Sequence, residues 1–317
     1  MKIRKKIGKW ATLLVIYMAI IVSVMEIAYR FQWIDFYNKE WQYQNGTIEK
    51  DGILVFGDSF SADPNGWLKC FRDNTDEIIM NASVPGIGPE SHKLFFERRV
   101  NESKPKHILI QLYVGNDLYD SKKPVNWIEQ GLLRNLYWTS SNNFRILGFL
   151  NYRLGQLSVE SINQGSPKND SIFDATKYSP RTKLYISGDP SYPEAHICVE
   201  RPHLGFECLI EHLQEMKSKT PKGVELSILI IPHCTQISKE YRENYKALGS
   251  NIKVDKVPPP IWKTFIESEG FYVIDPTDVL RKAEKRNISV YYPNDPHLNE
   301  TGSQIVAEYV ENQISKQ

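Results

Sequence analysis

From Gly52 onward, short apolar runs rich in β-branched residues alternate with longer stretches of helical periodicity. The runs are continuously apolar, which indicates strands that are buried on both faces. This order favours an α/β fold with a flavodoxin-like, doubly wound parallel sheet covered by helices. The expected strands are Ile53–Phe56, Ile78–Asn81, His107–Val114, Leu226–Ile231 and Phe271–Ile274.

Amphipathic stretches between these runs predict the covering helices. They are Glu90–Asn101, Leu204–Met216, Ile261–Glu269 and a C-terminal helix centred on Ile305–Val310. Residues 119–201 fit the pattern badly, because they are rich in Asn, Ser, Tyr and Trp and show little periodicity. We interpret them as an insertion into a domain that spans residues 52–317.

The first thirty residues have a different pattern. Five cations within residues 1–9 precede an apolar run at 10–29, which is long enough to cross about 30 Å of hydrocarbon. The positive-inside rule then predicts a cytoplasmic basic tail, a single-pass transmembrane anchor and an outward-facing domain. A cleaved signal peptide and a buried helix are the alternatives, but no small-residue cleavage site follows Met25. Residues 30–51 are expected to be a linker.

Polar and aromatic residues mark the outer end of this apolar run. Glu26 lies where a carboxylate can still reach water. Trp33, Phe36 and Tyr37 follow it and are expected to form an aromatic belt at the membrane interface.

Composition excludes some classes of function. The net charge of +1 provides no field for a polyanion, so nucleic acid is not an expected partner. No CxxC or HExxH motif occurs and the histidines lack ligand spacing, so we expect no metal site and no cofactor. Four cysteines could pair in an exported domain, Cys198 and Cys208 being the closest pair in sequence, but spacing does not fix a pairing.

The strongest local signal is the segment Gly57-Asp58-Ser59, which follows the first expected strand. A serine there stands at the carboxyl edge of the sheet, at the start of a helix. The alternative is that Ser59 only caps that helix. Three more segments are expected at this edge or beside the last helix, and they contain Gly86, Asn116 and His297.

In this order, the four segments resemble the blocks that define the SGNH hydrolase superfamily, with the insertion unmatched. The resemblance implies a three-layer α/β/α fold and a serine hydrolase or acyltransferase. Acyl transfer needs a nucleophile, a base, and donors aimed at an oxyanion. Ser59 and His297 would supply the first two. The N–H groups of Ser59 and Gly86 and the side chain of Asn116 would form the oxyanion hole.

The orienting acid departs from the superfamily pattern. Most members carry it three residues before the histidine, where this chain has Asn294. Pro296 favours an extended backbone at Asp295, so Asp295 and His297 would project to the same side. We therefore assign the acid to Asp295 and keep Asn294 as a neutral alternative. This D-x-H form resembles that of alginate O-acetyltransferases and related envelope proteins.

Four other polar residues near the expected site have simpler interpretations. Asp58 and Asp117 adjoin expected helix starts, where capping is the favoured role. His92 and His233 are interpreted as structural histidines, although His233 follows a strand at the catalytic edge.

The leading hypothesis is an esterase or O-acyltransferase, with acetyl as the expected group, acting on an envelope or secreted glycan through an acyl-Ser59 intermediate. The catalytic domain would be periplasmic or extracellular. Two of six Asn-x-Ser/Thr sequons adjoin expected catalytic residues, where a glycan would obstruct, which favours a bacterial envelope. The alternative is a non-catalytic glycan-binding or scaffold component of an envelope polysaccharide machine. For that role the aromatic residues of the insertion would stack on sugars (Trp127, Tyr137, Trp138, Phe144, Phe149 and Tyr152).

Overall fold

The computed structural model describes residues 2–118, 136, 139–141, 143–160, 170–177, 204–250, 252–258 and 260–316. The chain divides into two compact units. The smaller comprises residues 1–36 and 123–163, and the larger comprises residues 37–122 and 164–317. Most of the expected insertion lies outside the described residues, apart from one helix and a short segment at 170–177.

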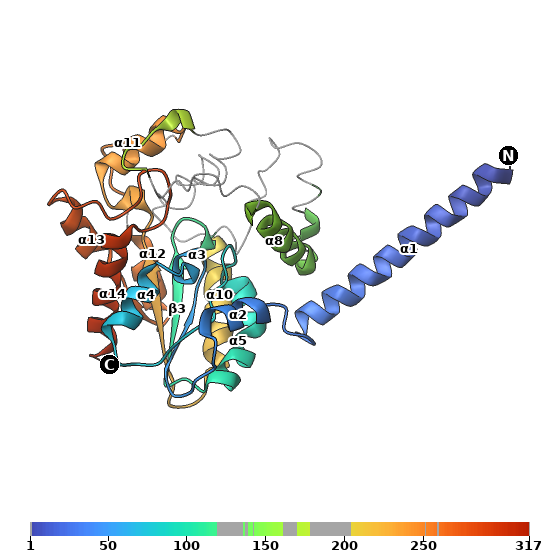
Figure 1. Cartoon of the computed structure of the whole chain (residues 1–317), viewed down its shortest axis with the longest axis horizontal. Coiled ribbons are helices and arrows are strands. Elements are labelled where there is room, and N and C mark those ends of the chain that lie inside the picture. The colour runs from blue at the N-terminus through green and yellow to red at the C-terminus, as the bar shows by residue number, and fades with distance from the viewer. Residues whose placement is uncertain are drawn as a thin grey trace. The chain divides into compact units, whose positions relative to one another are not determined.

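The larger unit is built on five parallel strands in the order β2-β1-β3-β4-β5 (Figure 1). This is the flavodoxin-like order expected from the sequence. The strands are β1 (Ile53–Phe56), β2 (Ile79–Asn81), β3 (His107–Tyr113), β4 (Glu225–Ile231) and β5 (Tyr272–Ile274). Each boundary lies within one residue of the prediction, because buried parallel strands are the most distinctly apolar segments of the chain.

Helices flank this sheet, and the four helices predicted from periodicity are among them. The α-helices described in the larger unit are α2 (Asn38–Asn45), α3 (Ser59–Ala62), α4 (Trp67–Asn74), α5 (Pro89–Ser103), α10 (Leu204–Ser218), α11 (Lys239–Ala247), α12 (Ile261–Ser268), α13 (Thr277–Glu284) and α14 (Glu300–Ile314). The predicted ones are α5, α10, α12 and α14. The sequence analysis missed α2, α4, α11 and α13, which have only eight or nine residues. Two turns give only a weak periodic pattern, and of the described eight-residue helices the sequence analysis predicted α12 alone. Helix α2 lies within the stretch expected to be a linker.

Alternate strand residues face opposite helical layers. Ile53 and Val55 join a core cluster that contains residues of α4, α13 and α14. Phe56, whose side chain points to the opposite face of the strand, packs against Phe95 and Phe96 of α5. Figure 1 shows α5 and α10 on one side of β3 and α4 and α14 on the other. The sheet is therefore buried on both faces, as the apolar runs predicted.

The outer edge of β2 is closed by a side chain of α2. The Asn45 Nδ2 donates to the Asn81 carbonyl (2.8 Å), and the Asn45 Oδ1 accepts from the Asn81 N–H (2.7 Å). One carboxamide thus replaces a neighbouring strand at this position, which satisfies backbone groups that an open edge would expose. The Asn81 Nδ2 in turn donates to the Ser61 carbonyl (2.8 Å), so the sheet edge also holds α3.

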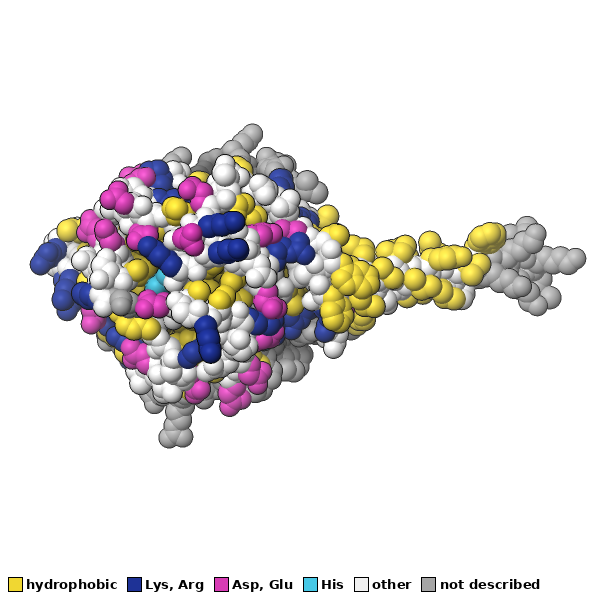
Figure 2. Space-filling model, turned by 90° about the horizontal axis from the view of Figure 1, so that it is seen from below, with side chains coloured by type: hydrophobic (Ala, Val, Ile, Leu, Met, Phe, Trp, Pro, Cys, Tyr) yellow, Lys and Arg dark blue, Asp and Glu magenta, His cyan; other side chains and the backbone are white. Residues whose placement is uncertain are grey.

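The smaller unit contains α1 (Lys2–Arg30) and α8 (Arg145–Glu160). Among the described residues, α1 is the helix long and apolar enough to cross a membrane, with a mean hydropathy of 2.1 over Thr12–Arg30. Figure 2 shows apolar side chains covering its surface. Helix α8 was missed within the insertion, where the sequence showed little periodicity.

Two acceptor oxygens of Glu26 fix α8 to the end of α1. Oε1 accepts from the Arg145 N–H (3.1 Å), and Oε2 accepts from the Ile146 N–H (2.8 Å). Oε1 also pairs with the Arg30 Nε at 2.5 Å. Glu26 therefore caps the N-terminus of α8 with a negative charge, which a helix N-terminus favours. The sequence-based expectation that its carboxylate reaches water is wrong, because Glu26 is buried.

The expected aromatic belt is only partly present. Trp33 is exposed, as an interfacial residue would be. Phe36 instead packs edge-on against Tyr29 and Phe149 within the smaller unit. Tyr37 is buried in the larger unit, where its ring lies 5.0 Å from that of Phe95. Two of the three rings therefore pack against other aromatic rings of the protein.

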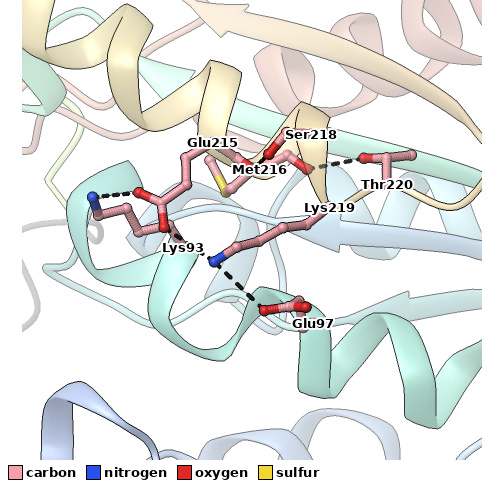
Figure 3. Close-up of polar contacts among 7 residues, drawn as sticks. All are labelled: Lys93, Glu97, Glu215, Met216, Ser218, Lys219 and Thr220. Carbon is pink, nitrogen blue, oxygen red and sulfur yellow. Dashed lines mark hydrogen bonds and ion pairs between the residues drawn. The ribbon is translucent and has the colours of Figure 1, made fainter.

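Ion pairs join α5 to α10 on the outside of their layer. The Glu215 carboxylate contacts the Lys93 Nζ at 2.6 Å and the Lys219 Nζ at 3.0 Å, and the Lys219 Nζ lies 3.5 Å from Glu97 (Figure 3). Partial burial raises the pKa of Glu215, but the two lysines outweigh it and hold that pKa below its ordinary value of 4.5. The carboxylate is therefore more favourable in the folded than in the unfolded chain.

A depressed folded pKa gives stability that is present above the unfolded pKa and lost as the pH falls through the folded pKa. Glu215→Gln should therefore lower the free energy of unfolding at pH 7, by less than about 1 kcal/mol because the side chain is partly solvated. The difference from the unsubstituted protein should shrink as the pH falls through the folded pKa of Glu215 and disappear below it. Urea unfolding followed by circular dichroism measures both. Glu211→Gln, at an exposed position of α10, is the matched control and should show neither effect.

Candidate active site

Ser59 lies where the first strand turns into a helix. Strand β1 ends at Phe56, and Asp58 caps α3 by accepting a hydrogen bond from the Phe60 N–H at 3.0 Å. Ser59 is the first helical residue, so the cap is Asp58 and not Ser59. The hydroxyl of Ser59 is thereby free of the capping role that was its alternative interpretation.

A buried glutamine lies beneath this turn. The Gln111 Oε1 accepts from the Asp58 N–H (3.2 Å) and from the Ser61 hydroxyl (2.8 Å). A Cβ at Gly57 would lie 2.4 Å from the same oxygen, so only glycine allows this approach. The sequence analysis missed Gln111, although one polar residue inside the apolar run of β3 was the available signal.

His297 is presented by a closed loop ahead of α14. Tyr291 and Leu298 form an antiparallel bridge, and the Tyr292 N–H donates to the His297 carbonyl at 3.2 Å. Asn299 then caps α14 by accepting from the Gly302 N–H at 2.9 Å. The backbone before and after the histidine is therefore fixed on both sides.

The loop brings three of the expected residues into one chain of contacts. The His297 Nε2 lies 2.7 Å from the Ser59 Oγ, and the His297 Nδ1 lies 2.5 Å from the Asp295 Oδ1. The same Asp295 oxygen accepts from the His297 N–H at 2.8 Å, which fixes the carboxylate relative to the ring. The Phe60 ring covers the imidazole with a centroid distance of 4.6 Å. This arrangement matches a serine nucleophile, its base and an orienting acid in geometry and order of contact.

Asn294, the alternative orienter, points elsewhere. Its Nδ2 donates to the Asp170 carboxylate (2.7 Å) and to the Ile172 carbonyl (3.0 Å), and its Oδ1 accepts from the Asp174 N–H (3.1 Å). The residue that precedes the acid thus holds a segment of the insertion.

The other two expected donors lie in loops at the carboxyl edge. Gly86 occupies an exposed turn after β2 with φ of +73°, and a hydrogen bond from the Val84 N–H to the Gly57 carbonyl (2.9 Å) ties that loop to the Ser59 turn. Within the described part of the chain, the N–H groups of Ser59 and Gly86 donate no hydrogen bond. Asn116 lies in the turn after β3.

Two buried carboxyl groups near the site are held by backbone N–H groups. The Asp117 Oδ2 accepts from the Tyr113 N–H at 2.6 Å. Burial raises the pKa of Asp58, while the Phe60 N–H and the charge of His297 oppose that rise. Neither carboxylate contacts the imidazole as Asp295 does. Asp58 caps α3 as expected, whereas Asp117 holds the N–H of Tyr113 at the end of β3.

The two further histidines are structural. His233 is buried and accepts from the Thr235 N–H at 3.2 Å, which caps a 3₁₀ turn, η5 (Cys234–Gln236). Burial lowers the pKa of His233 to about 3. His92 packs between Phe56 and Phe95, and burial lowers its pKa to about 3 while the Gly57 carbonyl opposes that shift. Both rings are neutral at physiological pH.

Several residues singled out in the sequence analysis take no part in this site or lie outside the described residues. Phe149 packs in the smaller unit, and Trp127, Tyr137 and Trp138 lie outside the described residues. Where the chain is described, no group of three or more His, Cys, Asp or Glu side chains is placed to hold a metal ion. Cys208 is a free cysteine, and Cys198, the cysteine nearest to it in sequence, lies outside the described residues.

Comparisons with known proteins give distant similarities only. No family model and no curated protein matches the chain. The acetyl xylan esterase AlAXEase is similar in structure, with 11% identity over 83% of this chain and 99% of that one and a TM-score of 0.42. A lipase/acylhydrolase from Enterococcus faecalis has 12% identity over 84% and 96% of the two chains (TM-score 0.38). The psychrotrophic esterase EstA from Pseudoalteromonas sp. has 13% identity over 85% and 98% (TM-score 0.37).

The contacts of Asp295 and Asn294 predict different effects of replacing them. Asp295→Asn should lower the acylation rate by about 10⁴, because an amide cannot stabilise the imidazolium. The corresponding Asp-to-Asn change in the catalytic triad of a serine protease has an effect of this size. Asn294→Ala should leave acylation nearly unchanged. Pre-steady-state release of nitrophenol from 4-nitrophenyl acetate measures both rates, after circular dichroism has established folding. A fast burst from Asp295→Asn with a slow burst from Asn294→Ala would reverse the assignment.

Proposed function

We propose that this chain is an SGNH-type serine esterase or O-acyltransferase that acts through an acyl-Ser59 intermediate. The observation that supports the proposal best is the continuous contact from Ser59 through His297 to Asp295. A structural serine and histidine would have no need of a carboxylate on the far nitrogen of the ring. In nucleophilic catalysis that carboxylate orients the base and stabilises the imidazolium that forms.

In the acylation step, the Ser59 Oγ attacks the ester carbonyl carbon and its proton passes to the His297 Nε2. Asp295 accepts the Nδ1–H bond and stabilises the imidazolium as it forms. The carbonyl oxygen becomes an oxyanion, for which the Ser59 and Gly86 N–H groups and the Asn116 amide are the proposed donors. Collapse of this intermediate breaks the ester bond, and the leaving alcohol takes the proton from His297.

The acyl-enzyme is then resolved by a second alcohol or by water. The acceptor gives its proton to the His297 Nε2 while its oxygen attacks the acyl carbon, and Ser59 recovers its proton when the intermediate collapses. With water the reaction is ester hydrolysis, and with a sugar hydroxyl it is O-acyl transfer. We propose acetyl as the acyl group and an envelope or secreted glycan as the carbohydrate.

The proposed cellular place of this chemistry is the outer face of a bacterial membrane, with α1 as an uncleaved anchor. Glu26, Tyr29 and Arg30 of α1 all contact residues that follow Asn142 in the chain. Removal of α1 together with Glu26 would leave the α8 N-terminus without its cap, which costs about 1 kcal/mol or more at a typical helix. A signal peptide that is cleaved off cannot stabilise the mature protein through such contacts.

The function is tested by incubating the full-length protein in detergent with 4-nitrophenyl acetate, with and without xylo-oligosaccharide as acceptor. We expect nitrophenol release and a labelled acetyl group on Ser59, and Ser59→Ala should lose both. Ser268→Ala is the matched control, because Ser268 is exposed on α12 and its hydroxyl donates only to the Phe265 carbonyl. Acetylated sugar would identify transfer, and acetate alone would identify hydrolysis. Release that is equal in the Ser59→Ala variant would disprove the proposal.

The anchor has its own test. The protein should stay in the membrane fraction after an alkaline wash, and mass spectrometry of the mature chain should find peptides from before Glu26. Glu26→Ala should lower the free energy of unfolding because α8 loses its cap. Glu49→Ala, at an exposed position of the larger unit, is the control. A mature N-terminus beyond Met25 would rule out the anchor.

A further inference from the structure

The Asn294 side chain uses its donors and its acceptor on one short segment of the insertion. Two donated hydrogen bonds and one accepted hydrogen bond all go to residues 170–174. Asn294 is only 2% exposed, so these bonds form away from water, where breaking one is most unfavourable. The bonds join the segment to the residue that directly precedes Asp295.

The segment is also ordered by itself. Asp174 accepts from the Thr176 N–H (2.9 Å) and hydroxyl (2.6 Å), which starts the 3₁₀ turn η3 (Ala175–Lys177). Phe173 packs against buried Leu248. Yet Ile172, between these fixed residues, has a side chain that is 76% exposed. Its backbone is held at the catalytic loop while its apolar side chain is left to solvent.

We propose that Asn294 is a positioning residue that fastens residues 170–177 beside the catalytic loop, so that Ile172 contacts the carbohydrate part of an acetylated glycan. This inference rests on the proposed function. The segment bonds to the residue next to Asp295, so a glycan whose acetyl carbon meets the Ser59 Oγ would present its sugars to this part of the surface. A large exposed apolar side chain on a fixed backbone suits the apolar face of a sugar ring.

The proposal also explains why an amide stands at position 294. A carboxylate could not donate to the Ile172 carbonyl, and at 2.7 Å it would repel the Asp170 carboxylate. Asn294, three residues before the histidine, therefore holds residues 170–174, and Asp295 supplies the charge that orients His297.

The test uses the full-length protein in detergent and two probes, 4-nitrophenyl acetate and acetylated xylo-oligosaccharide. Asn294→Asp should raise KM for the oligosaccharide about tenfold, the equivalent of one or two buried hydrogen bonds. Its kcat and its KM for 4-nitrophenyl acetate should stay within about twofold, because Ser59, His297 and Asp295 keep their contacts.

A reversed pair provides the rescue. Combining Asn294→Asp with Asp170→Asn removes the repulsion and lets the new amide donate to the new carboxylate, so part of the lost affinity should return, while the hydrogen bond to the Ile172 carbonyl stays lost. Asp170→Asn alone keeps an acceptor for the Asn294 Nδ2 and should have a small effect. Hydrogen exchange in residues 170–177 should rise in Asn294→Asp and fall again in the pair.

Ile172→Ala tests the contact with the sugar itself. It should raise KM for the oligosaccharide several-fold without changing hydrogen exchange in the segment, since the side chain makes little internal packing. Ile288→Ala is the matched control, because Ile288 is also an exposed isoleucine of the larger unit.

The outcomes separate this inference from the proposed function. If 4-nitrophenyl acetate is cleaved through Ser59 but Asn294→Asp or Ile172→Ala leaves KM for the oligosaccharide unchanged, the inference is wrong and the function stands. Cleavage of 4-nitrophenyl acetate with none of the oligosaccharide also overturns the glycan contact. A fall in kcat for 4-nitrophenyl acetate in Asn294→Asp would make Asn294 part of the chemistry instead. No Ser59-dependent release from either probe would overturn both.

Discussion

The 2.7 Å contact between the Ser59 Oγ and the His297 Nε2 joins residues that are 238 positions apart in the chain. Everything proposed about the function depends on it, and it depends on the sheet. The Ser59 turn follows β1, while the histidine loop is held by the bridge between Tyr291 and Leu298 and by the cap of α14. A parallel sheet brings strand ends from distant parts of the chain to one edge, where side chains of this kind can meet.

A small set of buried polar side chains makes that edge rigid. Gln111 holds the backbone of Asp58 and the hydroxyl of Ser61, and Asn81 holds the carbonyl of Ser61 from the side. Each uses an amide to satisfy groups that an apolar residue would leave unpaired in the core. Ser59 therefore rests on a fixed polar support. The proposed nucleophilic role would require such a support, because small displacements of a reacting group reduce the rate strongly.

Amide side chains recur at the points where segments are joined. Asn45 completes the edge of β2, and Asn294 holds part of the insertion. Both use donor and acceptor at once, which a carboxylate cannot do. In the smaller unit a carboxylate, Glu26, joins α1 to α8. A carboxylate is suitable there because its partners are the N–H donors at the start of α8 and the Arg30 side chain.

The sequence by itself determined the strands, their order, the longer helices and the residue types of the site, because long apolar runs and fixed motif spacings are local properties. It also predicted that the side chains of Asp295 and His297 project to the same side, since Pro296 restricts the backbone before it, and the two side chains are in contact. Only the tertiary structure decided what Asn294, Gln111 and Glu26 do. Each is a polar residue whose partners come from other segments, and no local pattern specifies a partner more than 50 positions away. The short helices were also decided by packing, since two turns gain most of their stability from the core they cover.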